Sequence, residues 1–206
     1  FGPEIARAAN RILYLKDSDM YVKGLADSGI VVLPEGNYQI KGEPYMHISR
    51  GTYSMLEDVI QQVFSGKKVA FVGGAESYRF SRLDDVYALK FDLPVQDKFI
   101  AMFDSYDDLH AYASSDDEMA ACISLVEAHG RELPSKIQKI KENTVLNFND
   151  ADILYSIGHK AKGLEHKNVV LSKDFNKIFN ESVHFNQSGQ RITYPEEEEM
   201  NVAYVG

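Results

Sequence analysis

Hydrophobic residues near the start of the chain recur at the spacing of one helical face. The residues that share this face are Ile5, Ala8, Ala9, Ile12 and Leu13. Pro3 stands just before them, at a position that the first turn of a helix tolerates. The pattern therefore predicts an amphipathic helix at the start of the chain.

Two apolar runs with a helical pattern between them predict a strand, a helix and a second strand. Residues 45–49 alternate as a strand does, and residues 67–72 form a short apolar run that ends at Gly73-Gly74. The core face of the intervening helix is formed by Met55, Leu56, Val59, Ile60 and Val63. Such a βαβ unit predicts parallel strands joined by a right-handed crossover. A further short strand is predicted at 30–33.

The character of the sequence changes after this unit. Residues 82–143 have a helical pattern without strand signals, and strands return at 153–157 and 168–171. A hairpin is predicted at 184–193, followed by a helix that begins near Pro195. The order of elements predicts an α/β domain that is interrupted by a helical insertion.

Composition limits the class of protein. The 206 residues are 44% hydrophobic and 26% charged, which suits one sizeable core, or one core with a smaller lobe. No apolar run approaches the roughly 20 residues that span a bilayer, so no membrane partner is expected. The single cysteine, Cys122, fits a reducing compartment and reads as a buried helix residue. We expect a cytoplasmic protein, or a nuclear one if the source is eukaryotic.

The net charge of −9 argues against a protein that wraps nucleic acid. The charge is uneven, however, because acidic residues crowd 104–118 and 196–199 while lysines gather at 160–167. A local basic surface is compatible with an acidic total. The acidic run at 104–118 reads most simply as a solvated face.

Common catalytic patterns are absent from the sequence. There is no phosphate-binding loop of the G-x-x-x-x-G-K-[ST] type, and the six histidines lack zinc-type spacing. Gly73-Gly74 has the look of a phosphate-binding turn, but a tight turn after a strand is the better interpretation. No metal site is expected in this chain.

The segment 159–165, between two predicted strands, is the strongest candidate for chemistry. His159, Lys160 and Lys162 have side chains that bind phosphates, and Gly163 permits close backbone approach. Glu165 has a carboxylate that accepts hydrogen bonds from sugar hydroxyls. On composition alone, an ordinary polar connector is an equally good interpretation.

The same segment, His-Lys-Ala-Lys-Gly-Leu-Glu, resembles motif V of UvrD/Rep-type superfamily-one DNA helicases. The spelling is closest to the branch of F-box DNA helicases and their bacterial relatives. Other segments resemble the same family in the same order, namely 1–6 with Ala9-Asn10, 48–50, 68–74 and 197–206. The similarity reaches both ends of the chain, so we expect a longer parent protein.

The resemblance implies an ATP-dependent DNA helicase or translocase that acts on single-stranded DNA in repair or recombination. It implies a RecA-like second motor domain (2A-like) from 1–80 and 146–206, with a reduced 2B-like helical insertion at 81–145. In this family ATP and Mg²⁺ bind between two motor domains, so the partners would be single-stranded DNA and a first motor domain. Mg²⁺ ligands are expected outside this chain.

Site residues follow from the resemblance, position by position. The ATP-binding candidates are Gly163, Glu165 and Lys162, and the DNA-binding candidates are His159, Lys160 and Arg50. No catalytic residue is expected in this chain. Arg50 is equally well interpreted as a salt-bridge residue at a strand end.

Three positions depart from the family pattern. Ile157 replaces a frequent threonine, His166 replaces an aromatic residue, and Gly51-Thr52 replaces Thr-Asn. Two other functions stay open. One is a helicase-derived protein- or DNA-binding module without motor activity, with the insertion as a surface for a protein partner. The other, weaker, is a nucleotide-binding enzyme that uses Gly73-Gly74.

We predict that the purified 206-residue chain does not hydrolyse ATP by itself. No part of the chain matches the family's phosphate-binding loop, acidic metal-binding motif or arginine fingers. The chain alone would therefore stabilise little transition-state charge. Phosphate release is the measurement. Turnover by the chain that disappears in Glu165→Ala would contradict the prediction.

Overall fold

The fold was described from a computed structural model, which covers residues 1–15, 19–27, 40 and 42–175. The predicted strand at 30–33, the hairpin at 184–193, the helix from Pro195 and the glutamate-rich run at 197–206 lie outside the described residues.

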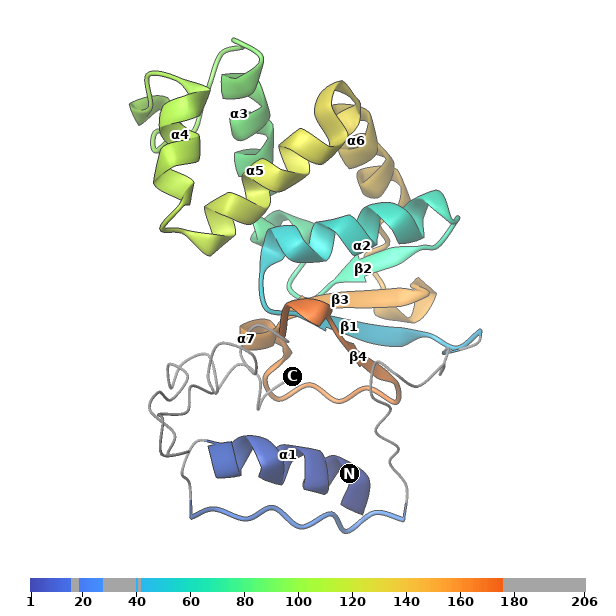
Figure 1. Cartoon of the computed structure of the whole chain (residues 1–206). Helices are drawn as coiled ribbons and strands as arrows, with labels where there is room; N and C mark the ends of the chain where they lie inside the picture. Colours follow the sequence, from blue (N-terminus) through green and yellow to red (C-terminus); the bar gives the residue numbers. More distant parts are fainter. Residues whose placement is uncertain (16–18, 28–39, 41, 176–206) are drawn as a thin grey trace, which may run out of the picture.

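A four-stranded parallel sheet forms the centre of the molecule (Figure 1). Its strands are β1 (Tyr45–Ser49), β2 (Val69–Phe71), β3 (Ile153–Ile157) and β4 (Val169–Leu171). Their order is β2-β3-β1-β4, and every neighbouring pair is parallel. The predicted α/β class is thus confirmed for the described residues.

The predicted βαβ unit is present, but its two strands are not neighbours. Helix α2 (Thr52–Phe64) connects β1 to β2, and β3 lies between these two strands. In the register, Val69 of β2 and Tyr45 of β1 both pair with Ile153 of β3. The hydrophobic pattern predicts these strands and their parallel direction. It does not predict that a strand about 80 residues further along the chain pairs between them.

The strands direct alternate side chains to two different cores. Phe71, Ile153 and Tyr155 face the larger core, which α2 covers. Met46 and Leu154 face a smaller core on the opposite side. Helix α2, which covers the larger core, lies above the sheet in Figure 1.

The helical insertion packs on the outer side of α2. Its elements are α3 (Phe80–Lys90), η2 (Ile100–Met102), α4 (Tyr106–Ala113), α5 (Asp117–His129), η3 (Gly130–Glu132) and α6 (Leu133–Asn143), and the short turns η1 (Ala75–Tyr78) and η4 (Phe148–Asp150) flank it. Helices α5 and α6 both contact α2. Cys122, on α5, is fully buried, as the sequence predicted.

One hydrophobic core joins the insertion to the sheet. It runs without interruption from Phe71 and Tyr155 through Leu56 and Val59 of α2 to Ile137 of α6. A wide face of α2 is buried, because the sheet and the insertion cover different sides of it. The helical character predicted for 82–143 is confirmed, whereas its status as a separate domain stays a prediction.

A polar network holds α2 to the two central strands. Asp58 Oδ2 lies 3.1 Å from Nδ1 of His47 on β1 and accepts a hydrogen bond of 2.6 Å from the Tyr155 hydroxyl on β3. Burial raises the pKa of Asp58, but the hydrogen bonds from His47 and Tyr155 outweigh it, so the pKa lies below its ordinary value. The carboxylate is therefore charged and paired inside the fold.

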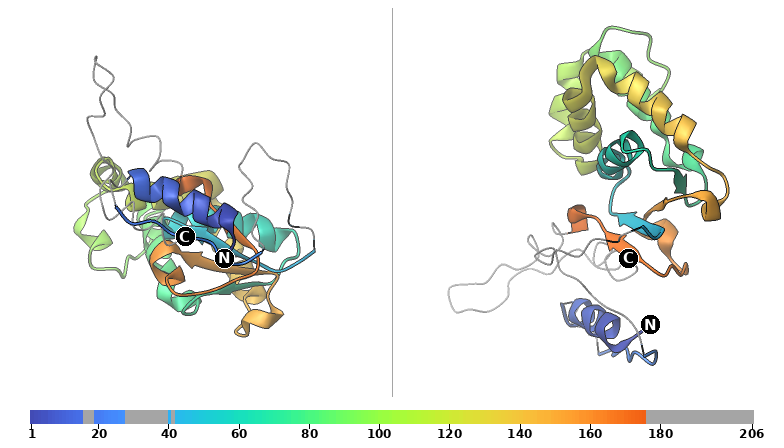
Figure 2. Two further views of the ribbon diagram at one scale, coloured as in Figure 1. Left: turned by 90° about the horizontal axis from the view of Figure 1, so that it is seen from below. Right: turned by 90° about the vertical axis from the view of Figure 1, so that its right-hand side faces the viewer.

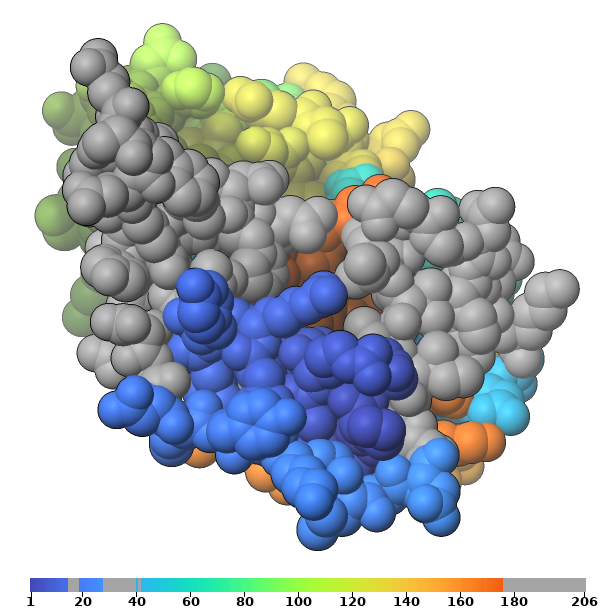
Figure 3. Space-filling model, turned by 60° about the horizontal axis from the view of Figure 1, so that its bottom comes forward, coloured from blue at the N-terminus to red at the C-terminus, as the bar shows by residue number. Residues whose placement is uncertain are grey.

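Helix α1 (Pro3–Leu15) covers the opposite face of the sheet, where Ile12 packs on the smaller core (Figure 2). Its side chain Asn10 exchanges two 2.8 Å hydrogen bonds with the backbone of Val22, which holds residues 19–27 against it. These residues form the outer surface of this face (Figure 3). The predicted helix is confirmed, but its face is centred on Ala6 and Leu13, and Ile5 is 40% exposed.

The remaining described elements are the short helix α7 (Gly158–Ala161) after β3 and the turn η5 (Lys173–Phe175) after β4. Among the described residues, no helix is long and apolar enough to cross a membrane.

We predict that Ile137→Ala lowers the free energy of unfolding by about 2–5 kcal/mol, because Ile137 is 2% exposed in the shared core. The sheet and the insertion should still unfold in one transition in urea, seen alike by circular dichroism and tyrosine fluorescence. Lys139→Ala, on the exposed side of the same helix, is the control. Two separate transitions would show that the insertion is an independent unit.

Candidate functional site

Four loops meet at the carboxyl ends of the parallel strands. They are 50–52 after β1, 72–77 after β2, 158–162 after β3 and 172–174 after β4. Open α/β sheets bind ligands at this edge, outside the strand ends. All DNA-binding candidates from the sequence, Arg50, His159 and Lys160, lie in these loops.

The edge has a topological switch point between β1 and β3. From β1 the chain crosses β3 through α2, on the face of the larger core. From β3 it crosses β1 through α7, whose Ala161 packs in the smaller core on the other face. In open α/β sheets, ligands bind at such a switch point. Arg50 and His159 follow the two strands that border it.

Asp174 joins the loops on the β1/β4 side of this point. Its Oδ2 accepts hydrogen bonds from the backbone N–H groups of Arg50, at 2.9 Å, and Gly51, at 3.2 Å. Ser172 N–H donates to the carbonyl of Ile48 at 2.8 Å. The ends of β1 and β4 are therefore held together. Asp174 was not among the candidates predicted from the sequence, although an acidic residue soon after a short apolar run is a recognisable signal.

The insertion supplies two further carboxylates to the same loop. Glu118 Oε1 accepts from the Thr52 N–H at 2.9 Å, and Asp117 Oδ2 lies 3.3 Å from the Arg50 guanidinium. A Cβ at position 51 would lie 2.5 Å from a Glu118 oxygen, so a larger residue there would require the Glu118 side chain to shift. Burial raises the pKa of Glu118, and hydrogen bonds from Thr52 oppose the rise.

These contacts bear on two interpretations. The acidic run was read as a solvated face, but Asp117 and Glu118 contact the loop after β1 because α5 begins beside it. Arg50 makes the salt bridge that was one of its two alternatives, while its role toward DNA is untested. No periodicity in the sequence connects Glu118 to Thr52, which lie 66 positions apart.

A hollow of about 400 Å³ opens beside this loop. Among the described residues, Asp117, Glu118 and Asp174 line it together with a single basic residue, Arg50. Three carboxylates against one guanidinium do not favour a polyanion such as a nucleotide. None of the three ATP-binding candidates lines this hollow.

Lys160 joins the loops on the β2/β3 side. Its ammonium donates to the carbonyl of Ser77 at 3.0 Å and to the Ser77 hydroxyl, and it lies 3.7 Å from the centre of the Tyr78 ring. Burial lowers the pKa of Lys160. In the same loop, Gly73 and Gly74 have φ of 77° and 82°, which confirms the predicted tight turn.

The ATP-binding candidates follow α7 and are accessible. Lys162 and Glu165 are exposed, and Gly163 has a φ of 80°, which only glycine adopts readily. Leu164 N–H donates to the Ala161 carbonyl at 2.9 Å, so Gly163 belongs to the turn that closes α7. Glu165 is the first residue after this turn. A nucleotide could therefore reach all three residues.

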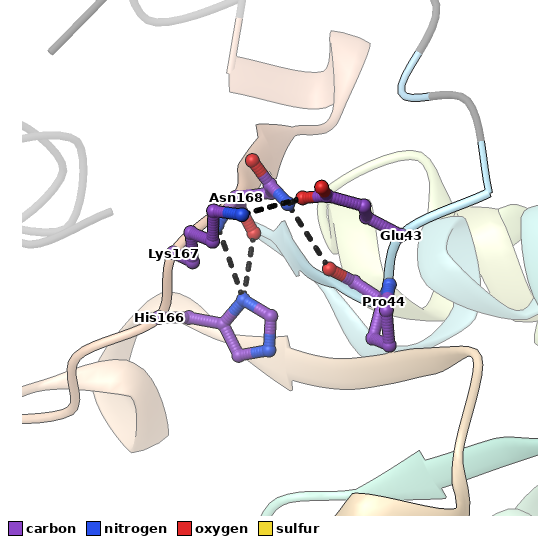
Figure 4. A network of polar contacts seen from close by, with 5 residues as sticks. All are labelled: Glu43, Pro44, His166, Lys167 and Asn168. Atoms are coloured by element: carbon purple, nitrogen blue, oxygen red, sulfur yellow. Dashed lines mark hydrogen bonds and ion pairs between the residues drawn. The ribbon is translucent and has the colours of Figure 1, made fainter.

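From Glu165 the chain returns to the amino end of the sheet, where a polar network fixes the start of β4 (Figure 4). Glu43 accepts from Lys167 at 2.9 Å and from the Asn168 amide at 3.1 Å. His166 Nδ1 lies 2.9 Å from the Asn168 carbonyl. The contact of His166 with the backbone of Asn168 thus helps to fix the start of β4.

Within the part of the chain that the structure describes, no group of His, Cys, Asp and Glu is arranged to hold a metal ion.

Comparisons with known proteins point to helicases. The chain is 29% identical over 193 residues to F-box DNA helicase 1 of Gallus gallus, an alignment that covers 85% of this chain and 18% of that protein. The chain is similar to a DNA helicase. It spans about a fifth of that relative's length. No protein family matches the chain, and no solved structure matches it.

We predict that Lys160→Met lowers the free energy of unfolding by about 1–2 kcal/mol, through loss of the Ser77 hydrogen bonds and the contact with Tyr78. Amide hydrogen exchange should also become faster at residues 74–78. Lys162→Met, at an exposed position of the same segment, is the control. Equal stability and exchange in both variants would mean that Lys160 does not tie the two loops.

Proposed function

We propose that this chain is the second motor domain of an ATP-dependent DNA helicase or translocase that acts on single-stranded DNA. The observation that carries the proposal is the position of Arg50 and His159, which follow the two strands on either side of the switch point. The similarity to a DNA helicase and the all-parallel sheet support it. A UvrD/Rep-type, RecA-like assignment and a role in repair belong to the same proposal.

ATP would bind between this chain and a first motor domain. Glu165 would accept hydrogen bonds from the ribose, Lys162 would face the phosphates, and the backbone at Gly163 would approach the nucleotide closely. All three positions are open to solvent or free of steric obstruction, which fits that role. The first motor domain would supply the phosphate-binding loop and the Mg²⁺ ligands.

DNA would cross the carboxyl edge near the switch point. His159 is exposed there and would contact the backbone or bases of the strand. Arg50 would contact a phosphate only if it exchanges its pairing with Asp117 for one with DNA. Lys160 would act mainly by positioning α7, because its ammonium already donates to Ser77.

The arrangement gives a physical route from nucleotide to DNA. His159 and Glu165 lie on one short segment, so a movement of the turn at Gly163 on nucleotide binding would also move His159. Lys160 ties this segment to the loop after β2, the entry to the insertion. Coupling of this kind is a difference in affinity between two states of one element.

A second candidate function is a helicase-derived binding module without motor activity. The observation that favours it is the loop at 50–52, where the carboxylates of Asp174 and Glu118 accept hydrogen bonds from three backbone N–H groups. A loop whose backbone N–H groups already donate to carboxylates binds phosphates less well than a loop whose N–H groups are free.

The ATPase rate of the full-length parent protein, with and without single-stranded DNA, separates these functions. We expect DNA to stimulate the rate strongly. Glu165→Ala should lower kcat/KM for ATP by about 10- to 100-fold, the loss of a hydrogen bond to a charged group.

Glu142→Ala, an exposed glutamate on α6, is the matched control and should keep the rate. A folded parent protein that DNA does not stimulate would refute the motor and favour the binding module. Stimulation that survives Glu165→Ala would leave the motor standing and remove Glu165 from the ATP site.

A further inference from the structure

Three aromatic rings contact one another at the outer surface of the insertion. Phe99 and Phe103 flank η2, Tyr112 belongs to α4, and the three ring centres lie 5.4–5.5 Å apart. Tyr112 is 39% exposed, and Met102 beside the rings is 75% exposed. Phe99 and Phe103 are partly buried against the main core, beside the fully buried Ile100 and Leu109, so Tyr112 and Met102 form the exposed apolar part of this region.

Carboxylates are frequent in the segment that carries these rings. Residues 97–118 contain seven aspartates and glutamates but only one lysine and no arginine. Asp104 and Asp107 are exposed and have no pairing role in α4, whereas Asp116 accepts a 3.5 Å hydrogen bond from the Tyr112 hydroxyl. A segment that combines the exposed Tyr112 and Met102 with an excess of carboxylates repels the phosphates of nucleic acid.

The protein itself shows which ligand suits such a surface. The Arg82 guanidinium lies 5.8 Å from the centre of the Phe99 ring, and its Nε lies 3.6 Å from Asp97. An arginine thus already pairs with one ring and one carboxylate of this region. Tyr112 and Phe103, together with Asp104 and Asp107 of the same segment, provide the same two chemical groups.

We propose that the acidic aromatic patch, defined as Phe99, Met102, Phe103, Asp104, Asp107 and Tyr112, is a docking surface for an arginine- and lysine-rich amphipathic segment of a partner protein. Guanidinium groups lie over the rings and pair with the carboxylates, and apolar residues of the segment cover Met102. Charge complementarity selects this occupant over nucleic acid. The proposal does not depend on motor activity.

The test measures binding of labelled peptides to the 206-residue chain by fluorescence anisotropy. The probe is a 16-residue helical peptide of arginine and leucine, with leucine on one face. Its two controls replace every arginine with glutamate, or every leucine with serine. We expect the probe to bind in a salt-dependent manner and more tightly than both controls.

Two variants with conservative changes at exposed positions test the surface. Met102→Ser, and Asp104→Asn with Asp107→Asn, should each weaken binding of the probe by about three- to tenfold. The matched control, Glu142→Gln with Asp150→Asn, removes the same charge from α6 and η4 and should leave the affinity within about twofold.

Equal affinity of the probe for all of these variants would overturn the proposal, as would equal binding of the probe and its serine control. Two other results would replace the occupant. Binding of oligothymidylate that Met102→Ser abolishes would assign the patch to nucleic acid. Self-association of the chain that Met102→Ser abolishes would assign it to a second copy.

Discussion

The packing of α2 on two sides is the constraint on which the rest of the structure depends. Its inner side covers the parallel sheet through Leu56 and Val59 and holds the strands through Asp58. Its outer side contacts α5 and α6 of the insertion. Because one helix serves both, the insertion is fixed to the sheet by a continuous core, and α5 places Glu118 at the loop after β1.

Two sets of contacts hold the loops at the carboxyl edge of the sheet. Lys160 joins the ends of β2 and β3, and Asp174 joins the ends of β1 and β4. The gap between these two pairs coincides with the topological switch point, where α/β sheets bind ligands. The pairs stabilise the loops on each side, so a ligand at the switch point would meet preformed edges on both sides.

Local patterns predicted much of the fold. Helix α1, the strands β1 and β3, helix α2 and the Gly73-Gly74 turn follow from periodicity and from residues with special backbone freedom. The placement of β3 between β1 and β2 could not be predicted, because it depends on pairing across about 80 residues. The contacts of Glu118 and Asp174 were missed for the same reason, and Lys160 was predicted as a DNA contact without its bond to Ser77.

The central claim is that DNA crosses the carboxyl edge of the sheet at the switch point. Photo-crosslinking of a thiothymidine-containing single strand to the full-length protein, mapped by mass spectrometry, tests it most directly. The account predicts crosslinks in 50–54 and 157–163, which flank the switch point. Crosslinks confined to the amino edge, at 43–45 and 166–168, or to the lysines of α6 would contradict it.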